Sequence, residues 1–191
     1  VALGSIKGMD LSEAAPWRRE VAVDALNGLG AIALDQGDTA HGDSLLREAR
    51  DLAGSDDLLA ARSLNTLALR TIRNGDRAAS LEILHEAKTR AERADDPLLL
   101  GRILNNLGTL HTESEQFDDA LELYQTALRI REGLDYRLGA VINLHNIGDV
   151  HFRLGDHARA WAAFKKSRDI ASASGYAPGV IMNDAFMAYL E

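Results

Sequence analysis

An apolar residue followed by a small one recurs along this chain at an almost constant spacing, and no other feature limits the possible folds as strongly. The small residues are 38, 40 and 40 positions apart in the four pairs Leu29-Gly30, Leu67-Ala68, Leu107-Gly108 and Ile147-Gly148. A second column keeps the same step with Ala49, Ala87, Ala127 and Ser167. Two columns that advance together indicate a tandem array of repeats rather than one compact enzyme-like core.

Apolar residues between the two columns return at steps of three and four, which is the period of an amphipathic helix. The third repeat shows two such runs: Leu104, Leu107 and Leu110, and then Ala120, Leu121, Tyr124, Ala127 and Leu128. Each repeat is therefore predicted to be a pair of helices. Gly-Asp pairs at 37–38, 75–76 and 155–156 predict the turn inside a repeat, because Gly adopts the left-handed conformation and Asp caps the next helix. The third repeat has Glu115-Gln116 at this place instead.

These residues resemble the tetratricopeptide repeat signature of Leu-Gly, an aromatic residue, Ala, a second aromatic residue and Ala. The resemblance is carried by Leu107, Gly108, His111, Ala120, Tyr124 and Ala127, and again by Ile147, Gly148, His151, Ala160 and Phe164. The period is longer than the family's usual 34 residues and is similar to that of Pins-type scaffolds and MalT-like regulator arms. The resemblance implies an all-α fold, a right-handed superhelical α-solenoid of helix-turn-helix repeats whose first helices line a concave groove.

The breaks between repeats predict how the chain is divided. Residues 1–15 lack a strong period, and we expect a disordered linker or an expression remnant there. Four repeats are expected at residues 16–54, 55–94, 95–134 and 135–174. Residues 175–191 are expected to form either the first helix of a truncated fifth repeat or a polar capping helix, since Asp184 stands where Leu144 stands in the fourth repeat.

Composition excludes several classes of function. The formal net charge of -8 argues against a nucleic-acid surface, which needs an excess of Lys and Arg. No apolar run is long enough for a membrane span, and the absence of Cys removes thiol chemistry, so we expect a cytoplasmic, non-catalytic protein. None of the familiar catalytic or phosphate-binding motifs is present, and no cofactor or metal is expected.

Candidate partner-binding residues lie three and four apart on the predicted first helices, on the side that lines the groove in the resembled family. The set comprises Asn27, Arg62, Asn65, Arg73, Arg102, Asn105, His145, Asp149 and Arg153. Amides pair with a peptide backbone and guanidinium groups bind carboxylates, so the predicted ligand is a protein or peptide with acidic character. The structural alternative is that Asn27, Asn65 and Asn105 bond one repeat to the next, and the sequence leaves both open.

Three functions follow from these residues. The first is a non-catalytic module, part of a larger protein, that binds a partner peptide or protein in the groove. The second is the regulatory or sensor arm of a multidomain signalling protein, such as an ATPase-type transcription regulator or a kinase, which acts within its own chain. The third is self-association through the apolar C-terminal end at Ala185, Phe186 and Met187.

Overall fold

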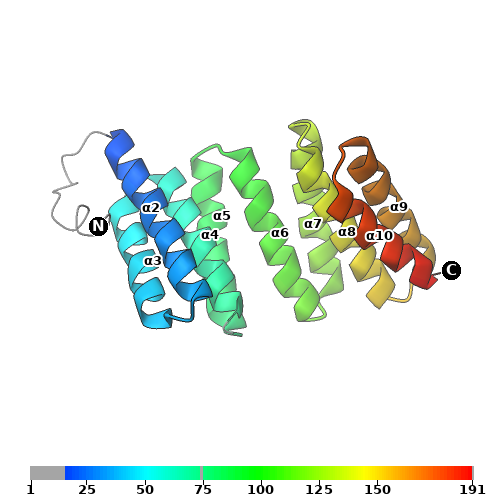
Figure 1. Ribbon diagram of the computed structural model, residues 1–191, viewed down its shortest axis with the longest axis horizontal. Coiled ribbons are helices and arrows are strands. Elements are labelled where there is room, and N and C mark those ends of the chain that lie inside the picture. Colours follow the sequence, from blue (N-terminus) through cyan, green and yellow to red (C-terminus); the bar gives the residue numbers. More distant parts are fainter. Residues whose placement is uncertain (1–15, 74, 191) are drawn as a thin grey trace. The chain divides into compact units, whose positions relative to one another are not determined.

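The computed structural model describes residues 16–73 and 75–190 (Figure 1). The predicted linker at residues 1–15 lies outside the described residues. The chain divides into two compact units, which we call unit 1, up to Asp96, and unit 2, from Pro97 onward.

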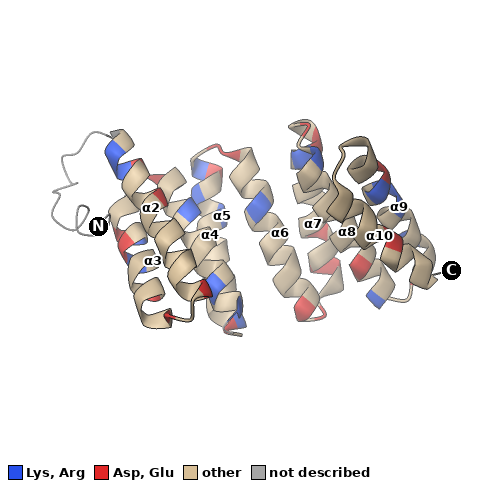
Figure 2. Ribbon diagram, in the orientation of Figure 1, with Lys and Arg blue, Asp and Glu red and all other residues tan. Residues whose placement is uncertain are grey.

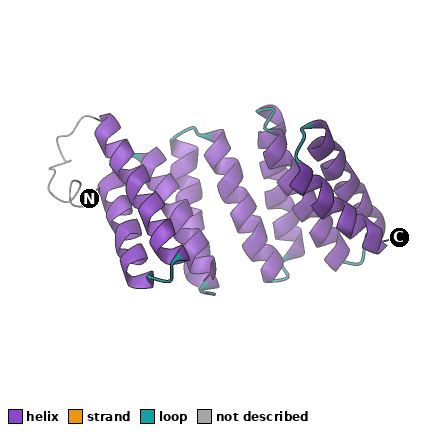
Figure 3. Cartoon of the chain, in the orientation of Figure 1, coloured by secondary structure: helices purple, strands orange, loops and turns teal. Residues whose placement is uncertain are grey.

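The described residues form helices joined by short turns, with no strand among them (Figure 3). Unit 1 contains α2 (Pro16–Asp35), α3 (Thr39–Ala53), α4 (Asp57–Arg73) and α5 (Arg77–Arg93). Unit 2 contains α6 (Pro97–Glu113), α7 (Phe117–Gly133), α8 (Arg137–Arg153), α9 (His157–Ala173) and α10 (Ala177–Leu190). The predicted all-α class and the helix-turn-helix repeat are confirmed, whereas the right-handed superhelix and the repeat boundaries remain predictions.

Successive helices pack pairwise, so that α2 lies on α3, α4 on α5, α6 on α7 and α8 on α9. The second helix of one pair also packs on the first helix of the next, as α3 does on α4, α7 on α8 and α9 on α10. In unit 1, one core cluster joins three helices: Val23, Leu26, Leu45, Ala49, Ala53, Leu59 and Ala60. Neighbouring helix pairs therefore bury apolar surface on each other, and an isolated helix pair would expose part of this surface to water.

The small residue of the repeated pair lies where two helices approach closely. A Cβ atom added to Gly108 would lie 2.7 Å from the Tyr124 ring, and one added to Gly148 would lie 2.6 Å from the Phe164 ring. Both rings are almost completely buried, Tyr124 at 2% and Phe164 at 0% exposure. Gly at these two positions therefore leaves room for the large aromatic side chain of the partner helix.

The turn inside a repeat has the predicted backbone form in three of four places. Gly37, Gly75 and Gly155 have φ of 85, 78 and 74°, and each precedes an Asp whose side chain accepts a backbone N–H of the next helix. In the third repeat Glu115 takes the positive φ of 59°, and Gln116 makes no side-chain capping bond. The turn thus keeps the same backbone conformation without glycine, although this conformation is unfavourable for Glu115.

Candidate functional site

The predicted site residues lie on the first helices of the repeats: α2 and α4 in unit 1, and α6 and α8 in unit 2. Positions three and four apart on each of these helices form a row that we call the first-helix face of its unit. First helices of successive repeats are neighbours inside each unit, since α2 contacts α4, α6 contacts α8 and α8 contacts α10. A ligand that lies across this face would therefore meet side chains from several repeats.

The two predicted cations of unit 1 are paired with carboxylates of α2. The Arg62 guanidinium lies 3.1 Å from Glu20 and 3.5 Å from Asp24. Arg73 lies 2.5 Å from Asp35 beside a small pocket of about 120 Å³ between α2 and α4. Two cations face three carboxylates here, so the first-helix face of unit 1 offers little attraction to an acidic ligand.

The contacts of Asn27 and Asn105 agree with the alternative interpretation, in which these side chains bond one repeat to the next. In unit 1, Asn27 is 8% exposed and donates from Nδ2 to the Ser63 hydroxyl at 3.1 Å, and Asn65 is buried at 5% exposure. In unit 2, the side-chain Oδ1 atom of Asn105 accepts from Nδ2 of both Asn143 and Asn146, each at 3.0 Å. These bonds join the first helix of one repeat to the first helix of the next.

Asn105 and Asn146 nevertheless keep polar groups for a ligand. Both side chains are half-buried, and among the described residues nothing accepts from the Asn105 Nδ2 group or donates to the Asn146 Oδ1 atom. One group is a donor and the other an acceptor, which matches the C=O and N–H that a peptide backbone presents. Ligand binding through Asn105 remains a prediction, and Asn146 was not among the predicted site residues.

His145 occupies the Asn105 position one repeat later and performs the same joining role. Its Nδ1 lies 3.0 Å from Asn183 Oδ1 of α10, and its ring packs against Phe164 and Phe186 at centroid distances of 5.3 and 5.1 Å. Burial lowers the pKa of His145 below its ordinary value, against the opposing effects of the Asn183 bond and the Asp149 charge. His145 is therefore a packing residue held in the neutral form.

Asp149 and Arg153 form an ion pair with each other along α8, with 2.9 Å between Arg153 Nε and Asp149 Oδ2. Asp149 is the more buried partner, with 26% of its side chain exposed against 49% for Arg153. No group of three or more His, Cys, Asp or Glu side chains that could hold a metal ion occurs among the described residues.

Arg102 differs from the other predicted cations. It is exposed on α6, where it is the only Lys or Arg of the helix (Figure 2), and no hydrogen bond or ion pair links it to another described residue. A guanidinium group with five donors and no acceptor nearby is suited to a carboxylate ligand. Among the predicted cations of the site, Arg102 is the one whose guanidinium has no bonding partner among the described residues.

Arg131 of α7 is a functional candidate that the sequence analysis missed. It is 5% exposed, and its Nη1 donates to the Gly139 carbonyl at 2.7 Å and to Asn143 Oδ1 at 2.8 Å, while Nη2 lies 3.4 Å from the Gly101 carbonyl. Its Nε atom is buried without a partner in the described structure. Burial and, to a smaller extent, the charge of Arg102 lower the pKa of Arg131, while Tyr136 raises it. The hydrophobic pattern gave no signal, because an Arg in the last turn of a helix usually serves its C-terminus.

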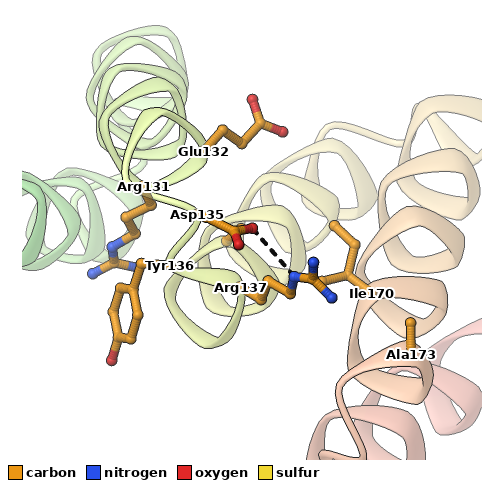
Figure 4. A pocket seen from close by; sticks show the side chains of 8 residues that line it. Arg131, Glu132, Asp135, Tyr136, Arg137, Ile170 and Ala173 are labelled. Atoms are coloured by element: carbon orange, nitrogen blue, oxygen red, sulfur yellow. Dashed lines mark hydrogen bonds and ion pairs between the residues drawn. The ribbon is translucent and has the colours of Figure 1, made fainter.

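Arg131 also contributes to the wall of a pocket of about 250 Å³ at the α7–α8 turn. Figure 4 shows the Arg131 guanidinium and the Tyr136 ring side by side, whereas Arg137 extends the other way, toward Ile170 and Ala173. Arg137, which also lines the pocket, pairs with Asp135 at 3.2 Å. The Arg131 guanidinium itself bonds to Gly101, Gly139 and Asn143 at the α6–α8 contact.

A search of the described helices for one long and apolar enough to cross a membrane found none.

Comparison with known proteins gives the family. A tetratricopeptide repeat model matches residues 71–133 and 99–173, which together span more than half of the 191 residues. The comparison with curated proteins found no match.

Three solved structures show the same fold at low identity. Aspartyl phosphate phosphatase F from Bacillus subtilis is 16% identical with a TM-score of 0.79, and the match covers 87% of this chain and 44% of that one. BtubC from P. vanneervenii is 21% identical with a TM-score of 0.81, covering 92% and 75%. A Signal Transduction ATPase with Numerous Domains (STAND) from Pyrococcus horikoshii is 16% identical with a TM-score of 0.79, covering 90% and 26%.

The chain thus spans less than half of the phosphatase and about a quarter of the STAND protein, and likeness at this identity establishes the fold alone. Tetratricopeptide repeats are generally non-catalytic modules that bind protein partners. With its repeated Gly column, its paired helices and a family match over more than half its length, the chain belongs to the tetratricopeptide repeat family.

Proposed function

We propose that this protein is an interaction module that binds a segment of a partner protein in extended form across the first-helix face of unit 2. One observation carries the proposal: Arg102 is exposed without a bonding partner in the described structure, close to the free donor of Asn105 and the free acceptor of Asn146. The amide groups would hold the backbone of the ligand, and Arg102 would hold an acidic group.

Unit 1 is expected to contribute less to the binding of an acidic ligand than unit 2. Its predicted cations Arg62 and Arg73 already have carboxylate neighbours at 2.5–3.5 Å. An incoming acid would have to displace Glu20, Asp24 or Asp35, which recovers little free energy at an exposed site. The acidic part of the ligand is therefore assigned to unit 2.

The test is capture of partners from an extract of the source cells by the wild-type protein and by Arg102→Glu. The matched control is Arg129→Glu, which changes an exposed Arg of α7 that contacts only Thr126 among the described side chains. We expect a partner that the wild type and the control retain and that Arg102→Glu loses. Retention by all three forms would contradict the proposal. Arg62→Glu is a poor probe, because it would place a third carboxylate beside Glu20 and Asp24.

Two further functions have support of their own. The STAND protein with the same fold carries a tetratricopeptide repeat sensor, which favours a regulatory arm that acts on other domains of its own chain. Self-association is favoured by α10, where Ile181 and Tyr189 are 69% and 76% exposed. Phe186 is instead packed against His145 and Phe164, so Ile181 and Tyr189 are the residues to change. Light scattering over a range of concentrations would detect self-association.

A further inference from the structure

We propose that the first two turns of α6 and α8 recognise a carboxylate that lies next to an apolar side chain of the ligand. The inference rests on the proposed function and names the ligand chemistry of that face. The residues concerned are called the α6–α8 patch and comprise Leu98, Arg102, Leu138 and Ile142.

The charge of the patch is not balanced by the protein. The exposed Arg102 follows Gly101, whose carbonyl lies 3.4 Å from Nη2 of the buried Arg131, and the Arg102 charge contributes to lowering the pKa of Arg131. Neither guanidinium has a carboxylate partner in the described structure, because Arg131 bonds only to carbonyl and amide oxygens. The neighbouring Glu132 is engaged with Lys166 at 3.0 Å. Two cations without a counter-charge produce a positive potential that favours an anionic ligand.

The apolar part of the patch is exposed at the same place. Leu98, Leu138 and Ile142 have 40%, 38% and 37% of their surface exposed. Leu138 and Ile142 are one helical turn apart, and Ile142 occupies the position of Arg102 one repeat later. A single exposed Leu is ordinary on a protein surface, but a cluster beside an unpaired cation offers an apolar contact that excludes water from the charge.

One guanidinium group brings the two helices together. Arg131 lies within hydrogen-bond distance of the Gly101 carbonyl on α6, the Gly139 carbonyl on α8 and the Asn143 side chain. Arg102 follows Gly101 directly, while Leu138 and Ile142 each adjoin one of the other two bonding residues. Arg102 on α6 and the apolar residues on α8 therefore each lie next to a residue that Arg131 bonds at the α6–α8 contact.

Unit 1 offers an internal comparison. Leu58 and Arg62 stand at the positions of Leu98 and Arg102, but Arg62 has Glu20 and Asp24 as counter-charges. The same apolar and basic sequence pattern thus gives a neutralised surface in unit 1 and a positive one in unit 2, so the carboxylate specificity is assigned to the α6–α8 patch.

The experiment is selection from an immobilised library of short synthetic peptides, followed by fluorescence anisotropy with single peptides. We expect the selected peptides to carry Asp or Glu, or a free C-terminus, beside Leu, Ile, Val or an aromatic residue. Replacement of the acid by its amide should weaken binding about tenfold or more, the effect of losing one charge-assisted hydrogen bond. Selected peptides made with a free or an amidated C-terminus distinguish a side-chain carboxylate from a terminal one.

Three variants complete the test. Arg102→Gln should remove the preference for acid over amide, and Ile142→Ser should remove the preference for an apolar neighbour. The control Leu154→Ser changes a 49% exposed Leu beyond the end of α8 and should change neither preference. Peptides that bind unit 2 without an acidic–apolar pair would overturn this inference and leave the proposed function standing. A library from which nothing binds would overturn both.

Discussion

At the scale of single residues, the repeat depends on matched sizes across each helix pair. Gly108 faces Tyr124 and Gly148 faces Phe164. At the same two positions the second repeat has Ala68, which is larger than Gly, and Leu84, which is smaller than an aromatic residue, and both are 0% exposed. Each of these contacts leaves little room for a larger side chain, because the buried interior has little free volume.

Gly108→Leu should destabilise the protein by about 1–3 kcal/mol, because the added side chain would overlap the Tyr124 ring. Gly28→Ala is the control: no atom lies within 4 Å of a Cβ at this exposed position of α2, and Ala should stabilise the helix by about 1 kcal/mol. Urea unfolding followed by circular dichroism measures both. An unchanged midpoint for Gly108→Leu would show that the helices do not approach as described.

At the scale of helices, polar side chains join one first helix to the next. Asn27 with Ser63, Asn105 with Asn143, and His145 with Asn183 are successive forms of the same contact. The Asn143 oxygen also accepts from Arg131, so Asn105, Asn143 and Arg131 form a connected polar network within unit 2. Such a network fixes the alignment of the helices, since any other alignment would leave buried polar groups unpaired.

The contact at His145 should make unit 2 sensitive to acid. The pKa of His145 is lowered in the folded state, so the unfolded chain binds more protons as the pH falls through about 6.5. The contribution of neutral His145 to stability is thus complete above this pH and decreases below it. Asp149 on α8 and Asn183 from α10 both oppose the shift.

His145→Asn should reduce the loss of stability between about pH 7.5 and 5.5, because Asn does not titrate and stands at this position in the preceding repeats. His85→Asn, a change of an exposed His in unit 1, is the control. His151 of α8 also has a pKa lowered by burial, so part of the pH dependence should remain. Urea midpoints at several pH values give the comparison, and an equal slope for wild type and His145→Asn would refute this account.

At the scale of the whole molecule, the chain has two compact units, each with its own core. The cluster of α2, α3 and α4 lies inside unit 1, and the cluster of Ala120, Tyr124, Ile147 and Val150 lies inside unit 2. In a repeat protein, stability is the sum of local terms, so damage in one place need not spread to the rest.

Gly148→Leu should therefore lower the protection of amides in α8 and α9 against hydrogen exchange more than that of amides in α3 and α4. The added side chain would meet the buried Phe164 ring within unit 2. Exchange measured by mass spectrometry on peptides from both units reports the two effects in one sample. An equal loss of protection in both units would show that the chain unfolds as a single cooperative block.

The helical repeat could be predicted from the sequence alone, because its signals are local and recur along the chain. These signals are small residues such as Gly108 and Gly148, the apolar spacing and the turns at Gly37, Gly75 and Gly155. The sequence also placed the candidate residues on one side of the first helices. Which of these residues are available to a ligand depends on the packing of the helices. Arg62 and Arg102 look alike in sequence, but α2 supplies carboxylates to the first and nothing in the described structure pairs with the second. The role of Arg131 was likewise decided by contacts with α6 and α8. The charge around a side chain depends on neighbours up to about one repeat away in sequence, and helical periodicity carries no information about them.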